Sequence, residues 1–228
     1  MYNVKPNLII GFHGCDADIC KRLLNDPDNI KINRNPYDWL GHGMYFWENN
    51  YERALQWAIE KQRRGAIREP AVIGALLQVG NCCDFLDTKY IQMLAAAYKM
   101  MVEEYRDLGI QLPRNRDLPS DQHKDMILRE LDCLAIEFMH ERVLLDIQTE
   151  IKQKGYSNKD VFDSTRGAFI EGGPIYEGAG IYEKTHIQIC IRNLNCIKGF
   201  FLPRKETDFQ NYSIVNEPGW PLEFQLWQ

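Results

Sequence analysis

Leu40-Gly-His-Gly-Met-Tyr-Phe-Trp-Glu48 is the segment that says most about how this chain folds. The apolar run after Gly43 is typical of a short buried strand, and the glycines before it predict a turn. Asn49 and Asn50 follow, and either can cap a helix whose apolar residues continue as far as Ile59. The segment therefore predicts a turn, a strand and a helix in direct succession.

Apolar runs on both sides of this segment predict further strands. Leu8–Phe12 is typical of a buried strand, and we expect it to open into a turn at His13-Gly14. Ala71–Val79 is apolar throughout and predicts a central strand covered on both faces. Further strands are predicted at residues 168–170, 185–191 and 197–202.

The middle of the chain has helical periodicity. Apolar residues recur at spacings of three and four from Ile91 to Leu108 and again from Ile127 to Ile151. The two helices predicted here belong to an insertion at residues 88–155, with a turn-rich connection between them. Strands on both sides of a helical block indicate an α+β fold rather than repeated βαβ units. We expect residues 1–228 to form one domain.

Composition narrows the class of protein. The chain has 228 residues, 45% of them hydrophobic, and a net charge of -5, which is typical of a globular protein without a general attraction for nucleic acid or anionic membranes. No apolar run approaches the roughly 18 residues of a membrane span. The first residues lack a secretory pattern, so we expect a cytoplasmic location. Seven scattered cysteines without a C-x-x-C pair predict no metal site.

Three groups of side chains on these strands are candidates for chemistry. His13 ends the first strand, and Tyr45 is followed one helix later by Trp57, so two aromatic rings could hold a flat ligand between them. His186 and Gln188 alternate along a later strand and so share one face. Taken singly, each group also has an ordinary structural explanation, as a hydrogen-bonded histidine or as core aromatics.

In this order, the motifs resemble the NAD-binding site of the diphtheria-toxin-like ADP-ribosyltransferases, which include the catalytic domain of poly(ADP-ribose) polymerases. That family has a His-Gly pair, a Gly-x-Gly-Ile-Tyr-Phe strand with an aromatic on the next helix, and a Glu on a late strand. His13-Gly14, Gly41–Phe46, Trp57 and the strand His186–Ile191 occupy these positions. The resemblance covers residues 8–86 and 166–202.

The sequence is most similar to a bacterial subgroup of unknown function that has Gln at the position of the catalytic Glu. The resemblance implies an ADP-ribosyltransferase-like split β-sheet core with the helical insertion. It further implies a NAD-dependent mono-ADP-ribosyltransferase, a bacterial toxin or defence effector, that modifies a protein or a nucleic acid. A neutralising protein partner is also expected.

The resemblance also implies roles for single residues. His13 would bind the adenosine ribose, Gly14 would offer its backbone to the carboxamide, and Tyr45 would stack on nicotinamide with Trp57 on the other face. Gly43 belongs to the same cofactor site.

Other residues would complete the site. Gln188 would take the place of the catalytic Glu, unless Glu183 or Glu171 supplies the acid. His186 would guide the acceptor, and Arg34 and Arg166 are candidates for binding the pyrophosphate.

Several alternatives remain open from the sequence. Because an amide cannot stabilise a cation as a carboxylate does, the chain could instead be a sensor that binds NAD or ADP-ribose without turnover, or an interaction module. Cys15 and Cys190 lie near histidines, but buried structural thiols explain them better than a nucleophile does. The cations at Lys61–Arg64 are typical of a helix C-terminus.

Overall fold

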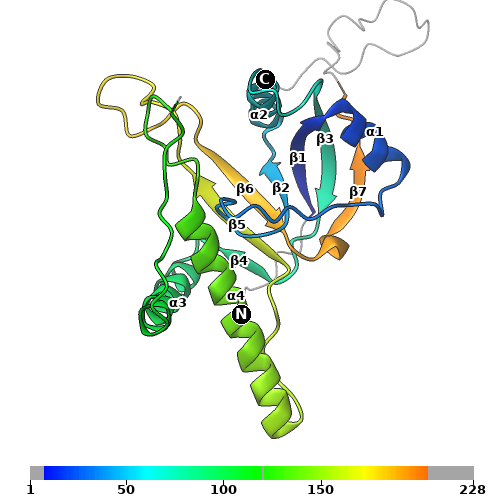
Figure 1. Ribbon diagram of the computed structural model, residues 1–228. Helices are drawn as coiled ribbons and strands as arrows, with labels where there is room; N and C mark the ends of the chain where they lie inside the picture. The colour runs from blue at the N-terminus through cyan, green and yellow to red at the C-terminus, as the bar shows by residue number, and fades with distance from the viewer. Residues whose placement is uncertain (1–7, 120, 205–228) are drawn as a thin grey trace, which may run out of the picture.

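The computed structural model describes residues 8–119 and 121–204 (Figure 1). In chain order the elements are β1 (Ile9–Asp16), α1 (Ala17–Asn25), β2 (Met44–Glu48), α2 (Tyr51–Arg63), β3 (Pro70–Leu77), β4 (Cys82–Asp84), α3 (Thr88–Asp107), α4 (Glu130–Lys154), β5 (Ser164–Phe169), β6 (His186–Ile191), a 3-10 turn (Leu194–Cys196) and β7 (Ile197–Phe201).

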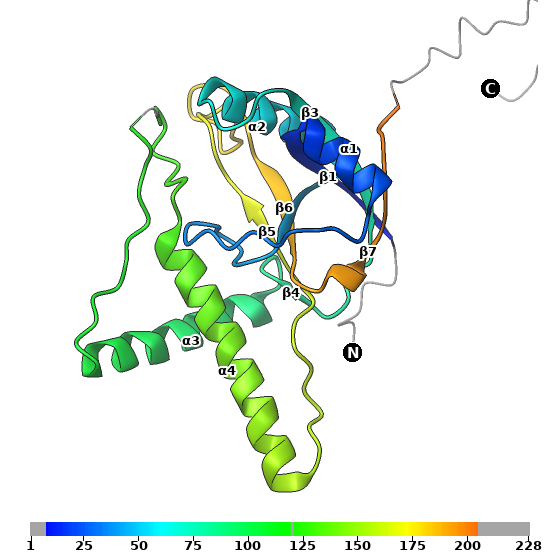
Figure 2. The ribbon, with the colours of Figure 1, turned by 45° about the vertical axis from the view of Figure 1, so that its right-hand side comes forward.

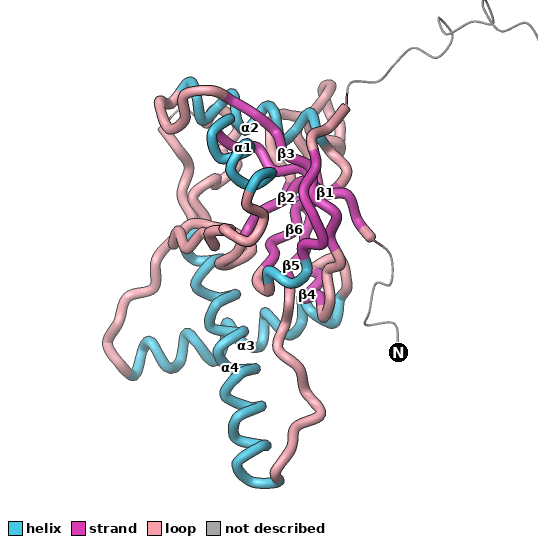
Figure 3. The backbone as a smooth tube through the Cα atoms, turned by 90° about the vertical axis from the view of Figure 1, so that its right-hand side faces the viewer, coloured by secondary structure: helices cyan, strands magenta, loops and turns pink. Residues whose placement is uncertain are grey.

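The described strands form one seven-stranded mixed sheet in the order β4-β5-β6-β2-β1-β3-β7. Only β4 and β5 pair in parallel, and the other neighbours are antiparallel. The predicted α+β class is confirmed. The expectation of a split sheet is wrong as stated, because hydrogen-bonded pairing continues across all seven strands. Figure 3 shows the strands following one another through the middle of the molecule.

The shortest paired stretch in the sheet lies between β1 and β2. These strands pair at only two positions, Gly11 with Glu48 and Phe12 with Trp47, whereas β1 pairs with β3 at eight positions. The predicted turn at His13-Gly14 is wrong, because both residues belong to β1 and continue its ladder with β3. Beyond Phe12, therefore, β1 stays with β3 and separates from β2.

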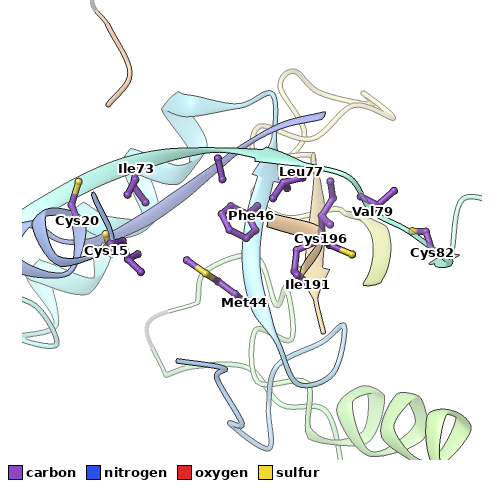
Figure 4. Packing of buried hydrophobic residues seen from close by; sticks show 13 residues of the cluster. Cys15, Cys20, Met44, Phe46, Ile73, Leu77, Val79, Cys82, Ile191 and Cys196 are labelled. Carbon is purple, nitrogen blue, oxygen red and sulfur yellow. The ribbon is translucent and has the colours of Figure 1, made fainter. Parts of the chain in front are cut away.

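Helices α1 and α2 cover opposite faces of this part of the sheet. Cys20 and Leu23 of α1 join the largest core cluster together with Phe46 (Figure 4). Ala54 of α2 packs instead with Trp47, the next residue along β2. Because neighbouring residues of a strand point to opposite faces, the two helices lie on different sides of the sheet.

The close approach of α2 to β1 depends on Gly14. A Cβ at this position would lie 2.2 Å from the carbonyl oxygen of Ala54, far inside van der Waals contact.

Asn50 caps the helix by accepting a hydrogen bond from the backbone N–H of Arg53 at 3.0 Å. The predicted Asn-capped helix after the β2 segment is confirmed.

Helices α3 and α4 lie apart from α1 and α2 (Figure 2). They occupy the predicted insertion and pack against each other through a cluster that includes Met101 and Met139. α4 ends at Gly155, whose φ of 82° suits a left-handed helix cap. Glu137 of α4 accepts the backbone N–H of His42 at 2.8 Å and pairs with Arg192 at 3.0 Å, so α4 is tied to the turn before β2.

The described part of the chain was searched for membrane-spanning helices and for clusters of metal-binding side chains. Within it, no helix combines the length and apolar character needed to cross a membrane. Among the same residues, no group of three or more His, Cys, Asp or Glu side chains is placed to hold a metal ion.

Candidate functional site

A cavity of about 830 Å³ lies where β1 and β2 separate. Its walls include residues of α1, α2, β1, β2 and β6, the loop at residues 30–39 and the loop after β5. Leu118, Ile127 and Leu128 of the connection between α3 and α4 also line it. A volume in this range is typical of small-molecule and cofactor sites.

His13 bridges the gap that opens between the two strands. Its Nδ1 lies 2.8 Å from the carbonyl oxygen of Tyr45. A carbonyl oxygen only accepts, so Nδ1 carries the proton and Nε2 keeps a lone pair. Burial lowers the pKa of His13 from 6.5 to about 4, and the imidazole is therefore neutral at pH 7. The side chain thus replaces a backbone ladder bond and lines the cavity.

Tyr45 presents its ring to the cavity and uses its hydroxyl within the protein. The hydroxyl donates to the carbonyl oxygen of Gly41 at 2.7 Å and accepts from the N–H of Leu40 at 2.9 Å. Burial raises the pKa of Tyr45 well above its usual value, so the phenol stays protonated. These bonds fix the turn before β2 and orient the ring.

Gly43 also lines the cavity, and packing explains why no side chain is present there. A Cβ at Gly43 would lie 2.5 Å from both the sulfur of Cys190 and the carbonyl oxygen of Ile191. The glycine lets the start of β2 lie against β6.

Gln188 lies opposite Trp47 of β2 and Gly167 of β5. Its Oε1 accepts a hydrogen bond from Trp39 Nε1 at 2.6 Å. Gly167 makes room for this partner, because a Cβ there would lie 2.9 Å from the Trp39 ring. The amide oxygen is therefore already bound, and Gln188 is held in one orientation.

His186 lies two residues before Gln188 and lines the same cavity. Its Nδ1 lies 2.6 Å from the carbonyl oxygen of Lys184, and its ring stacks on Phe169 with centroids 5.6 Å apart. Burial lowers the pKa of His186 to about 4, and the charge of Arg53 adds to this effect. Like His13, it is a neutral imidazole with a free lone pair on Nε2.

The sequence did not point to Arg53, whose guanidinium forms a buried ion pair with Glu171 at the cavity wall. Arg53 is 4% exposed and Glu171 is 5% exposed. The N–H of Lys184 donates to the carbonyl oxygen of Glu171 at 3.0 Å, which extends the β5–β6 pairing beyond Phe169 and His186. The sequence spacing could have identified Arg53. It precedes Trp57 by four residues, so the two side chains share one face of the predicted helix.

The structure does not bring every predicted residue into the cavity. Glu183 and Arg34 are exposed and do not line it. Gly14 is also outside the lining, since α2 packs directly over it. A carboxamide therefore has no access to the backbone of Gly14 from this cavity.

Arg166 is buried away from the cavity in an ion-pair network. It binds Glu48 at 2.6 Å through Nε and Asp84 at 3.0 Å through Nη1. The two carboxylates raise the pKa of Arg166 against the effect of burial. The prediction that Arg166 binds a pyrophosphate is contradicted, because its charge is already neutralised within the sheet.

Cations gather around Trp57 on α2. Lys61 Nζ and Arg64 Cζ each lie 5.3 Å from the centroid of the indole ring. Arg22 of α1 and Lys31 line the same cavity, and within the described residues none of these four cations forms an ion pair with an acid. The cavity is therefore electropositive although the chain as a whole is acidic.

The chain matches no protein-family model, no curated protein and no solved structure.

Proposed function

We propose that the protein is a NAD-dependent mono-ADP-ribosyltransferase with an ADP-ribosyltransferase-like fold. The observation that carries this proposal is that one cavity is lined by His13, Tyr45, Trp57, His186 and Gln188, which come from β1, β2, α2 and β6. These are the residues for which the sequence resemblance implies contact with NAD or its acceptor.

The reaction exchanges one bond at the anomeric carbon of the nicotinamide ribose. The bond to nicotinamide breaks and its electron pair leaves with the ring, which becomes neutral. A lone pair of the acceptor forms the new bond, and the acceptor loses a proton. The transition state is a sugar cation, so the site must place the leaving group and stabilise positive charge.

Aromatic and imidazole groups suit the two ends of NAD. The rings of Tyr45 and Trp57 offer apolar faces for nicotinamide. His13 is neutral, so its Nε2 accepts a hydrogen bond from a ribose hydroxyl. Because Nδ1 is fixed on the Tyr45 carbonyl, this acceptor points in one direction.

Glu171 supplies the negative charge that Gln188 lacks. Of the two acids considered from the sequence, Glu171 lines the cavity and Glu183 does not. Glu171 forms a buried ion pair with Arg53, and the positive charge of the guanidinium reduces the field of the carboxylate at the sugar. Such partial compensation favours slow transfer of a single ADP-ribose.

Lys61 and Arg64 take the pyrophosphate role expected of Arg34 and Arg166. Both line the cavity beside Trp57 and are unpaired with acids among the described residues. Burial lowers the pKa of Lys61, and an adjacent phosphate would oppose that shift.

Release of nicotinamide from NAD tests this function directly. We expect purified protein to release it, Tyr45→Ala to lower the rate at least tenfold, and Gln188→Glu to raise it. Tyr98→Ala on the exposed surface of α3 is the matched control and should leave the rate unchanged.

A second candidate is a sensor that binds NAD without turnover, and it is favoured by the uncharged Gln188 and the neutralised Glu171. Calorimetry with recovery of the ligand separates the two. Tight binding of NAD that is recovered intact after long incubation would show a sensor, and the transferase would be refuted.

A further inference from the structure

Unsatisfied buried polar atoms gather on the cavity wall. Within the described residues, the buried side-chain atoms without a hydrogen-bond partner are Asp38 Oδ2, Trp47 Nε1, Arg53 Nε and Nη1, and His186 Nε2. All four residues line the cavity. Buried polar groups are nearly always paired in native proteins, so this cluster indicates a ligand that brings its own donors and acceptors.

Three of these residues define the chemistry of that ligand. Arg53 and Trp47 can only donate, whereas His186 Nε2 accepts because Nδ1 donates to Lys184. The rings of Trp47 and His186 lie 6.1 Å apart. A phosphodiester or a carboxylate offers acceptors alone and would leave His186 unpaired. The edge of a nucleobase presents donors and acceptors side by side.

Aromatic rings surround the same polar atoms. Phe169 stacks on His186, Trp39 meets Phe169 edge-on with centroids 5.0 Å apart, and Trp47 completes the wall. Stacking of bases on such rings binds single-stranded nucleic acids with little dependence on their sequence. The pocket therefore combines a stacking surface with groups that bind a base edge.

The charge of the cavity exceeds what a dinucleotide requires. Its lining contains five cations, Arg22, Lys31, Arg53, Lys61 and Arg64, and two acids, Asp38 and Glu171. Arg53 neutralises Glu171, and Lys61 with Arg64 accounts for the two phosphates of NAD. Arg22 and Lys31, on α1 and in the loop that follows it, are left for further phosphates.

We propose that the acceptor is a base of a single-stranded nucleic acid, bound between Arg53 and His186, with backbone phosphates on Arg22 and Lys31. This inference rests on the proposed transferase function. A nitrogen or oxygen of the base attacks the anomeric carbon as nicotinamide leaves. The proton released by the base passes to His186 Nε2 or to water.

Binding can be measured without NAD, by fluorescence anisotropy with a labelled single strand of mixed sequence. The protein should bind DNA or RNA single strands more tightly than the matching duplex, whose base edges are paired. Arg22→Ser with Lys31→Ser should weaken binding and reduce the salt slope by about 0.7 for each phosphate that the protein no longer neutralises. Lys99→Ser with Lys152→Ser, which removes the same charge from exposed sites on α3 and α4, should leave the slope unchanged.

Transfer is then followed with NAD labelled in its adenylate phosphate and separation on a denaturing gel. We expect label on the oligonucleotide with the native protein and none with the Arg22/Lys31 variant, which should still release nicotinamide by transfer to water. Arg53→Lys, which keeps the charge beside Glu171 but removes the guanidinium donors, should lower transfer more than hydrolysis. Label on protein alone, with equal binding of both double variants, would overturn the nucleic-acid acceptor. No nicotinamide release under any condition would instead overturn the transferase.

Discussion

Replacing Glu171 by Gln leaves the guanidinium of Arg53 charged and without its anion in a nearly closed environment. Arg53 is 4% exposed, and its Nε and Nη1 lack hydrogen-bond partners, so water does not readily solvate the charge that is left. Breaking one side of a buried ion pair typically costs about 3–5 kcal/mol. We expect the free energy of unfolding to fall by that amount.

Removing both charges should have a much smaller effect. In Arg53→Met with Glu171→Leu, apolar groups of similar volume fill the space, and such replacements are commonly neutral or stabilising by about 1–4 kcal/mol. The exposed pair Arg68–Asp18 is the matched control, because its side chains are 86% and 65% exposed. Asp18→Asn should change stability by less than about 1 kcal/mol.

Urea unfolding followed by tryptophan fluorescence gives these free energies. The native protein, Arg53→Met, Glu171→Leu and the variant with both substitutions form a double-mutant cycle that gives the coupling between the two sites. A strongly non-additive cycle is expected, with the double variant more stable than Glu171→Gln. The reasoning about a desolvated pair is refuted if Glu171→Gln and Asp18→Asn cost the same, or if the two single effects simply add.

Three further predictions concern the same parts of the molecule. Burial lowers the folded-state pKa of His13 and His186 to about 4 and that of His140 to about 3, from the usual value of 6.5. The unfolded chain therefore binds protons more readily, so the stability that these histidines contribute is present above pH 6.5 and is lost as pH falls towards 4. Thermal unfolding at a series of pH values measures this, and a stability that is flat from pH 7 to 4.5 would contradict it. Gly14→Ala should destabilise the fold by at least about 1–3 kcal/mol, because the new Cβ would overlap the carbonyl oxygen of Ala54. Gly65→Ala is the control for backbone strain, because its φ is 71° but no atom lies within 4 Å of the new Cβ. All seven cysteines are buried, and burial raises the pKa of Cys15 to about 12, so a thiol reagent should react quickly only after unfolding, whereas fast labelling of the native protein would refute the assigned burial.

Local sequence patterns predicted the elements that carry most of the site. Alternation along the β6 segment placed His186 and Gln188 on one face, and both do line the cavity. The Asn-capped helix after β2 carries Trp57 to the same space. These predictions depend only on the period of a strand or helix, which a short window of sequence contains.

Features that depend on distant contacts could not be predicted. Arg53 meets Glu171 across 118 positions of the chain, and in sequence it resembles any exposed arginine near a helix start. The strand predicted at residues 168–170 begins earlier, at Ser164, and pairing of this strand with β4 brings Arg166 beside Asp84. The short strand β4 was missed for the same reason, since three residues carry no period and pair only with a strand that follows the insertion.

The short pairing of β1 with β2 divides the sheet into two parts that are joined by few hydrogen bonds. Two residue pairs, the hydrogen bond from the backbone N–H of Asn49 to the carbonyl oxygen of Ile10 at 2.9 Å, and the imidazole of His13 connect β4-β5-β6-β2 on one side with β1-β3-β7 on the other. Because this boundary has fewer strand-to-strand connections than the eight paired positions of β1 with β3, we expect the sheet to flex here first. A molecule bound in the cavity would contact strands on both sides of this boundary. Its binding would therefore restrict movement of β1-β3-β7 relative to β4-β5-β6-β2.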